Sequence, residues 1–246
     1  MAQNPTLKSV ILFLYCTLCI TALSISVSAQ SEKSLLSFDA SIGASILNGP
    51  ISDSGFPFGL ARNGYYLRMG AHYLLLKNAG ISLNFSNSLH PYDINAAANY
   101  LLEQDPFAFS LMVRSGDYSI SMLTTGIFYN LNLAPKWSVQ LFGNAGMTVV
   151  QTPRIQAEIM TEPNTSLRYG IGRTSAFAWN LGIQPRFHLN ERMNLQLTVD
   201  WSASNPVVSG FDQQRREFSY GIGFRQLQIG AGIVYHIQKK GKEKLR

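Results

Sequence analysis

The sequence predicts an all-β fold, an eight-stranded antiparallel up-and-down transmembrane β-barrel. Three observations lead to this prediction. Eight segments alternate apolar and polar residues with a period of two, which is the pattern of a strand with two different faces. The connections between these segments are alternately long and short. Charged residues make up 14% of the chain, against about 25% in ordinary soluble domains, although its hydrophobic fraction of 46% is ordinary.

The first 29 residues read as a secretory signal peptide, which is excluded from the fold. Lys8 precedes an apolar run over 10–25, and the segment closes with the small residues VSA, a pattern typical of a cleavage site. An uncleaved membrane anchor is the alternative, because the run approaches the roughly 18 residues of a helical span. Both cysteines, Cys16 and Cys19, lie in this segment. The mature chain therefore cannot form disulfides or thiolate metal sites.

The first four strands are predicted at 36–46, 65–75, 81–89 and 118–131. In the first, Leu, Phe, Ala and Ile alternate with Ser, Asp and Gly, and in the second, Tyr, Leu and Met alternate with residues that include Arg68 and His72. The third sets Ile, Leu and Phe against Ser and Asn. The fourth is less regular, with Leu123, Ile127 and Tyr129 on its apolar face.

The last four strands are predicted at 137–149, 174–189, 194–204 and 225–237. The clearest is 194–204, NLQLTVDWSAS, in which Leu, Val, Trp and Ala take one face and Gln, Thr, Asp and Ser the other. The last strand sets Leu, Ile, Ala and Tyr against Gln, Gly and His236. Most of the eight segments reach the roughly 9–11 residues that a tilted transmembrane strand needs.

The connections indicate which way the apolar faces point. Along the chain they contain 18, 5, 28, 5, 24, 4 and 20 residues. Membrane barrels have short periplasmic turns and long extracellular loops, whereas a soluble meander has no reason to sort its loops by end. The aromatic residues of the apolar faces also gather near the two strand ends, as expected at membrane–water interfaces. The apolar faces are therefore predicted to contact lipid, with a secreted soluble β-sandwich that binds a ligand as an alternative.

The domain boundaries follow from these segments: a signal peptide at 1–29, a barrel at 30–237 and a basic periplasmic tail at 238–246. The formal net charge is +6, but five of the Lys and Arg residues and one Glu lie in the tail. Without the tail and Lys8, 14 basic and 13 acidic residues remain. This even balance gives no indication of nucleic-acid binding.

The architecture resembles the small eight-stranded outer-membrane β-barrel proteins, the group of OmpA-like barrel domains. The resemblance covers 36–237 and includes the last strand, where GAGIVYHI looks like the C-terminal assembly signal of that group, with Gly232, Tyr235 and Ile237 at its characteristic positions. The chain departs from the group in having nine residues after Ile237 and no room for a peptidoglycan-binding domain. The resemblance implies a bacterial outer-membrane location and recognition of the last strand by the barrel-assembly machinery.

Charged and histidine side chains on the inward faces predict a polar network in the barrel interior. Its predicted members are Asp39, Arg68, His72, Arg186, His188, Asp200 and His236. A buried charge needs a partner, so Asp39 is expected to bond with His236, His72 or Arg186, and Asp200 with Arg68 or nearby polar groups. A metal site among the histidines is an alternative without close spacing to support it, and we expect no metal and no cofactor.

Two other features could carry function. Ser88 and His90 lie at the outer rim of the third strand, with Asp93 just after it, and some barrels of this kind modify lipids with Ser, His and acidic residues at the rim. The second feature is the pair of long loops, 90–117 and 150–173, as possible sites for a protein partner. The first contains an Ala- and Leu-rich run that predicts a short helix ending before Pro106. The second alternates like a strand and is expected to extend the barrel above the membrane.

The sequence thus favours an integral outer-membrane barrel with a structural or interaction role, such as surface contact, envelope integrity or membership of an assembly. The expected partners are outer-membrane lipid, the assembly machinery and a protein at the long loops. Although the fold is porin-like, eight strands enclose only enough space for side chains, so no pore is expected. The alternative function is an outer-membrane enzyme that modifies lipids by acyl transfer or deacylation.

Overall fold

The computed structural model describes residues 36–53, 59–104, 110–160, 165–169, 172–211 and 217–237. The predicted signal peptide, 1–29, and the basic tail, 238–246, lie outside the described residues.

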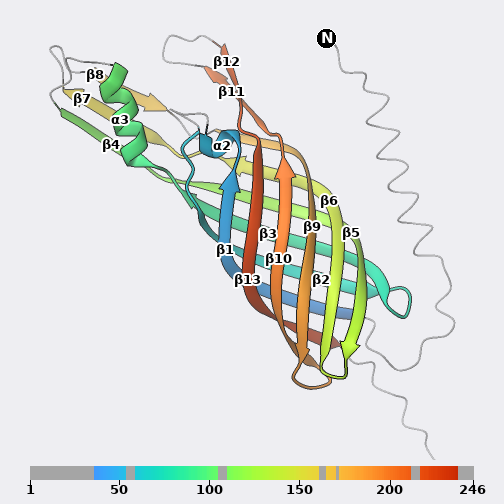
Figure 1. Cartoon of the computed structure of the whole chain (residues 1–246). Coiled ribbons are helices and arrows are strands. Elements are labelled where there is room, and N and C mark those ends of the chain that lie inside the picture. The colour runs from blue at the N-terminus through green and yellow to red at the C-terminus, as the bar shows by residue number, and fades with distance from the viewer. Residues whose placement is uncertain are drawn as a thin grey trace, which may run out of the picture. The chain divides into compact units, whose positions relative to one another are not determined.

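Eight strands close into an antiparallel barrel (Figure 1), which confirms the predicted fold. The order around the barrel is β1-β13-β10-β9-β6-β5-β3-β2, so each strand pairs with the preceding and the following barrel strand in the chain, and β1 closes on β13. The barrel strands are β1 (Leu36–Asn48), β2 (Gly64–Leu74), β3 (Ala79–Pro91), β5 (Asp117–Ala134), β6 (Trp137–Gln151), β9 (Arg173–His188), β10 (Met193–Ser204) and β13 (Phe224–Ile237).

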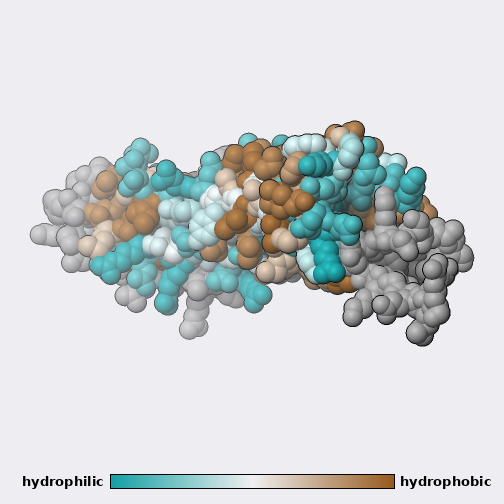
Figure 2. All heavy atoms as spheres, turned by 90° about the horizontal axis from the view of Figure 1, so that it is seen from below, coloured by the Kyte–Doolittle hydropathy of each residue, from teal (hydrophilic) through white to brown (hydrophobic). Residues whose placement is uncertain are grey.

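The two faces of each strand point as the alternation predicts. On β10, Leu195, Leu197 and Trp201 are 42–59% exposed, whereas Gln196 and Asp200 are at most 3% exposed. Figure 2 shows hydrophobic side chains gathered over the outer surface of the barrel, between hydrophilic patches. A polar interior and an apolar exterior are the reverse of a soluble protein, and they fit a barrel surrounded by lipid.

Aromatic side chains pack in pairs on the outer surface near both ends of the barrel. The rings of Trp179 and Trp201 meet edge to face at a centroid distance of 5.0 Å, and those of Trp137 and Phe187 meet at 5.0 Å with tilted planes. Tryptophan rings are favoured at the boundary between apolar and aqueous layers because each has an apolar body and a polar N–H group. Within the described ranges, no helix is both long and apolar enough to cross a membrane.

The connections separate by length between the two ends of the barrel. The short ones, 75–78, 135–136 and 189–192, lie at what we call the short-connection end. The long ones lie at the other, the long-connection end, and contain α2 (Pro50–Asp53), α3 (Ile94–Gln104), β4 (Ser110–Ser115), β7 (Ile155–Met160), β8 (Thr165–Tyr169), β11 (Val207–Phe211) and β12 (Glu217–Gly221). One of these elements, α3, confirms the helix that was predicted in the 90–117 loop.

The 150–173 loop extends the barrel as expected, because β7 continues the pairing of β5 with β6 beyond the rim, although its strands do not join the closed wall. Its two strands, β7 and β8, form a separate three-stranded sheet with β4 from the preceding long connection. The ladder of β6 stops at Gln151, and Pro153 follows two residues later. Proline has no N–H to donate to a ladder, so the ladder is interrupted there, and β4 and β7 resume it beyond the rim in the same register.

An apolar core, which we call the mouth core, fills the long-connection end of the barrel. Its strand members point inward from the barrel wall, and its other members come from the long connections. The members are Leu47, Ile51, Ala61, Tyr92, Ala97, Tyr118, Ile120, Met122, Val150, Ile155, Ala178, Val208, Ile222 and Phe224. Gly49, with a φ of 106°, turns the chain out of β1 so that α2 can bring Ile51 into this core.

Candidate functional site

The barrel interior contains two ionic contacts, one between neighbouring strands and one between strands that are not neighbours. Asp39 of β1 hydrogen-bonds with Nε2 of His72 on β2. Arg68 of β2 lies 3.8 Å from the carboxylate of Asp200 on β10. All four side chains are at most 5% exposed. The structure thus brings Asp39 together with one of its three expected partners, and Asp200 with Arg68.

Arg68 is the centre of the second contact. Its Nη2 donates a hydrogen bond to Oδ1 of Asn84 at 2.7 Å, and its guanidinium carbon lies 4.4 Å from the centre of the Phe142 ring. Asn180 donates to the Asp200 carboxylate at 2.9 Å. The charges of Arg68 and Asp200 are therefore held by an amide on each side and by an aromatic face, which stabilises ions removed from water.

Glycines make room for these groups. A methyl group at Gly70 would lie 2.6 Å from Oδ2 of Asp39, and one at Gly182 would overlap the ring of Phe142, on which Arg68 stacks. A small barrel has little interior volume, so positions opposite large side chains must be left without one.

Gly182→Val is expected to destabilise the barrel by about 1–3 kcal/mol, because it forces Phe142 out of its rotamer and away from Arg68. The measurement is the urea midpoint of unfolding in detergent micelles, followed by tryptophan fluorescence. Gly116→Ala is the control, since nothing lies within 4 Å of the added methyl group. An unchanged midpoint for Gly182→Val would contradict this account of the packing.

The remaining members of the predicted network lie toward the short-connection end. Nδ1 of His188 bonds with the side-chain oxygen of Asn194 at 2.9 Å, and the Asn194 amide nitrogen lies 2.8 Å from Nε2 of His236. Nη2 of Arg186 donates to Oε1 of Gln184 at 2.8 Å. Within the described ranges, no hydrogen bond joins Asp39 to Arg186 or His236. Sequence analysis named the charged members but missed their amide partners, which lie on the same inward faces of the strands.

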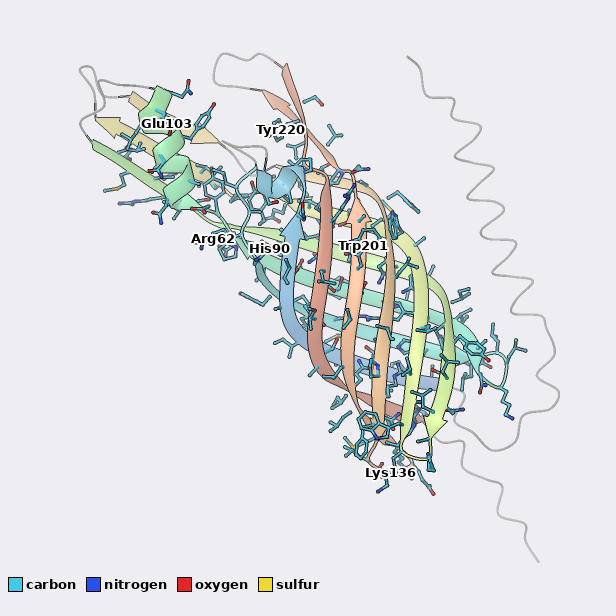
Figure 3. All side chains as sticks on the ribbon, viewed as in Figure 1. Arg62, His90, Glu103, Lys136, Trp201 and Tyr220 are labelled. Atoms are coloured by element: carbon cyan, nitrogen blue, oxygen red, sulfur yellow. The ribbon has the colours of Figure 1, made fainter. Side chains whose placement is uncertain are left out.

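The rim residues considered for catalysis do not hydrogen-bond directly with one another, although the Gln226 amide contacts both Ser88 and His90. His90 lies between Oγ of Ser45, 3.2 Å from its Nε2, and the backbone oxygen of Arg62, which accepts from Nδ1 at 2.9 Å. Ser88 accepts a hydrogen bond from Gln226 at 2.8 Å. Figure 3 shows His90 and Arg62 close together at the long-connection end.

Asp93 has a separate role in the fold. Its Oδ1 accepts from the backbone N–H of Ala96 at 3.0 Å, which caps the start of α3, and its other oxygen lies 3.8 Å from Nε of Arg62. The carboxylate therefore orients a helix and an arginine rather than His90.

The residues of the resembled assembly signal lie on β13, which closes the barrel against β1. Tyr235 pairs with Phe38 and Ile237 with Leu36, and both Tyr235 and Ile237 are more than 40% exposed on the outer surface. Gly232 lies opposite Ser41, with no room for a larger residue against the β1 backbone. For metals, the described part of the chain holds no group of three or more His, Cys, Asp or Glu residues with ligating geometry.

Comparisons with known proteins give similarity at the level of structure. No protein-family model matches the sequence, and no curated protein matches it. The attachment invasion locus protein Ail of Yersinia pestis is 12% identical with a TM-score of 0.45, covering 82% of this chain and 99% of Ail. Neisserial surface protein A is 9% identical with a TM-score of 0.45, covering 83% of this chain and 98% of that protein.

A major outer membrane protein from Thermus thermophilus is 11% identical with a TM-score of 0.47, covering 82% of this chain and 99% of its own. Similarities at these sequence identities and TM-scores carry no information on function. The proposals below therefore rest on the side chains of this chain.

Proposed function

We propose that this protein is an integral β-barrel of the bacterial outer membrane that acts through its surface rather than through a pore or a catalytic centre. The observation that carries the proposal is the filled barrel: a buried polar interior is followed by an apolar mouth core, inside a wall whose outer face is apolar. A wall of this kind is stable in lipid, and such an interior leaves no open path along the axis.

We place the short-connection end in the periplasm and the long-connection end outside the cell. This assignment rests on the rule that barrels of this type have short periplasmic turns and longer external loops. The surface that a partner would contact is then the part formed by α3 and the sheet β4–β7–β8. On it, Ile94, Tyr100 and Leu102 of α3 and Met112 of β4 are 41–45% exposed.

Exposed apolar side chains on an external helix support an interaction role, because such groups are stabilised when a partner removes them from water. The test is native mass spectrometry of the protein extracted in mild detergent, with Ile94, Tyr100 and Leu102 all changed to Ser. Loss of a co-purifying protein in this variant, and its retention in the matched Asn95→Ser, Asn99→Ser variant of the same helix, is expected. An identical set of bound proteins in all three samples would contradict the proposal.

The pure protein is expected to form no stable channel in planar lipid bilayers. Tyr66, Arg68, Phe128 and Phe142 are buried inside the barrel at no more than 5% exposure, and the mouth core fills the long-connection end. The control is a variant with Tyr66, Phe128 and Phe142 changed to Ala, in which conductance steps become possible. Reproducible conductance of the unmodified protein, equal to that of the control, would show that the interior is open.

Lipid modification by Ser88, His90 and Asp93 is the second candidate that the sequence raises. Because these residues bond with Gln226, Ser45 and Arg62 in the structure, no geometric observation favours it over the first. The mass of lipid A from cells with and without the protein separates the two: an unchanged mass is expected, and a mass shift of one acyl chain would favour the enzyme.

A further inference from the structure

Arg186 is a buried cation without a carboxylate bonded to it. It is 4% exposed on the inward face of β9, where Nη2 donates to the neutral Gln184 and Nε has no hydrogen-bond partner among the described residues. The two interior carboxylates are bonded elsewhere, Asp39 with His72 and Asp200 with Arg68 and Asn180. Asp39 attracts Arg186 through space. A buried guanidinium in this situation is stabilised strongly by any anion that reaches it.

Further donors lie beside Arg186 on both neighbouring strands. Gln196 of β10 pairs directly with it across the ladder, is 3% exposed, and has no partner for either polar atom of its side chain among the described residues. Ser138 of β6 is its ladder partner on the other side. Side chains directly opposite each other in a ladder are neighbours, so a guanidinium, an amide and a hydroxyl border the same space.

His188 and His236 lie between Arg186 and the short-connection end, and both are half-buried. They are joined through Asn194 and lie within electrostatic range of each other and of Arg186. The backbone N–H of His188 donates to the carbonyl of Lys136, which Figure 3 shows at the short-connection end. The imidazole rings of His188 and His236 thus lie between the short-connection end and Arg186.

The short connections make this end of the barrel electropositive. Residues 75–78, 135–136 and 189–192 contain Lys77, Lys136 and Arg192 but one acidic residue, Glu191. An opening that is bordered by charges of one sign and by low-dielectric walls concentrates ions of the opposite sign.

We propose that the short-connection end of the barrel is a binding site for an oxyanion, a phosphate group above all. The group enters from this end past His188 and His236 and is bound by the guanidinium of Arg186 and the amide of Gln196. A planar guanidinium fork matches the oxygens of a phosphate and gives strong, charge-assisted hydrogen bonds. The phosphate is either free in solution or the headgroup of an anionic phospholipid in the adjacent leaflet. This site is separate from the external surface of the proposed function.

The test is calorimetric titration of inorganic phosphate into the purified full-length protein, in neutral detergent and phosphate-free buffer of low ionic strength. Saturable binding of about one phosphate per barrel is expected. Arg186→Gln is expected to weaken it at least about tenfold, because a hydrogen bond to a charged group is lost. The matched control is Arg173→Gln, which removes the same charge at the opposite end of β9 and is expected to leave binding unchanged.

A second variant keeps the test valid if Arg186→Gln does not fold. His188→Gln combined with His236→Gln leaves Arg186 in place and is expected to weaken phosphate binding by a smaller factor. Absence of saturable binding to the folded protein would overturn the proposal, as would equal binding by Arg186→Gln or equal loss in Arg173→Gln.

Two lipid titrations distinguish the sources of the phosphate. Short-chain phosphatidylglycerol and short-chain phosphatidylcholine are each added below their micelle concentrations, in competition with phosphate. Displacement by the anionic lipid and not by the zwitterionic one identifies a headgroup site. Displacement by neither identifies a site for free phosphate, and both results support binding at Arg186.

Discussion

His72→Ala is expected to lower the free energy of unfolding by about 3–5 kcal/mol, one of the two largest single effects in this barrel. The substitution removes the bond to Oδ2 of the buried Asp39 carboxylate, whose Oδ1 has no hydrogen-bond partner among the described residues. It also removes the contact of His72 with the Gln140 amide, 3.1 Å away. The measurement is a urea titration in lipid vesicles, followed by tryptophan fluorescence and by heat-dependent gel mobility.

A second substitution separates the lost charge partner from the lost volume. Asp39→Asn in the His72→Ala background removes the unpaired charge and is expected to recover part of the stability. Arg186→Ala in the same background is expected to recover none, because Arg186 bonds with Gln184 and not with Asp39. If Arg186→Ala recovered as much as Asp39→Asn, the pairing of Asp39 with His72 would be wrong.

Arg68→Met is expected to cost a similar amount, about 3–5 kcal/mol. It removes the ion pair with Asp200, the hydrogen bond to Asn84 and the stack on Phe142, and it leaves Asp200 with the Asn180 amide as its remaining bonded partner among the described residues. The same urea titration applies. Because Met retains most of the length of Arg, the loss measures the interactions of the guanidinium rather than a cavity.

Two further variants serve as controls for Arg68→Met. Asp200→Asn in its background is expected to restore part of the stability, because no unpaired charge then remains in the interior. Arg225→Met, at an exposed position on β13, is expected to change the free energy of unfolding by no more than about 0.5 kcal/mol. A large loss in Arg225→Met would show that the assay responds to net charge and not to the buried pair.

The sequence predicted which residues belong to the candidate site, but not which of them bond with one another. Alternation fixes the face of each residue, so Asp39, His72, Arg68 and Asp200 could be placed inside the barrel. The register and stagger of the strands decide which inward residues reach one another across the interior, and these depend on how the barrel closes. For this reason the sequence left three partners open for Asp39, and the structure brings it together with His72.

The mouth core was not anticipated, since the members that close it come from the long connections rather than from the alternating barrel strands. Ile51, Tyr92 and Ile222 lie in three different long connections, and nothing local to each indicates that they meet. The sheet of β4, β7 and β8 is similar: β4 and β7 continue the pairing of β5 with β6, but the interruption at Pro153 and the pairing of β7 with β8 keep it out of the closed wall.

The sequence by itself determined the number of barrel strands, their faces and the ends at which long and short connections lie. These features depend on the two-residue period of a strand and on local chain length, both of which can be read along the chain. The tertiary structure alone decided which charges pair, where Arg186 is left without a bonded carboxylate, and how the long connections close the mouth. Those features depend on contacts between residues far apart in the chain, which exist only after β1 has closed on β13.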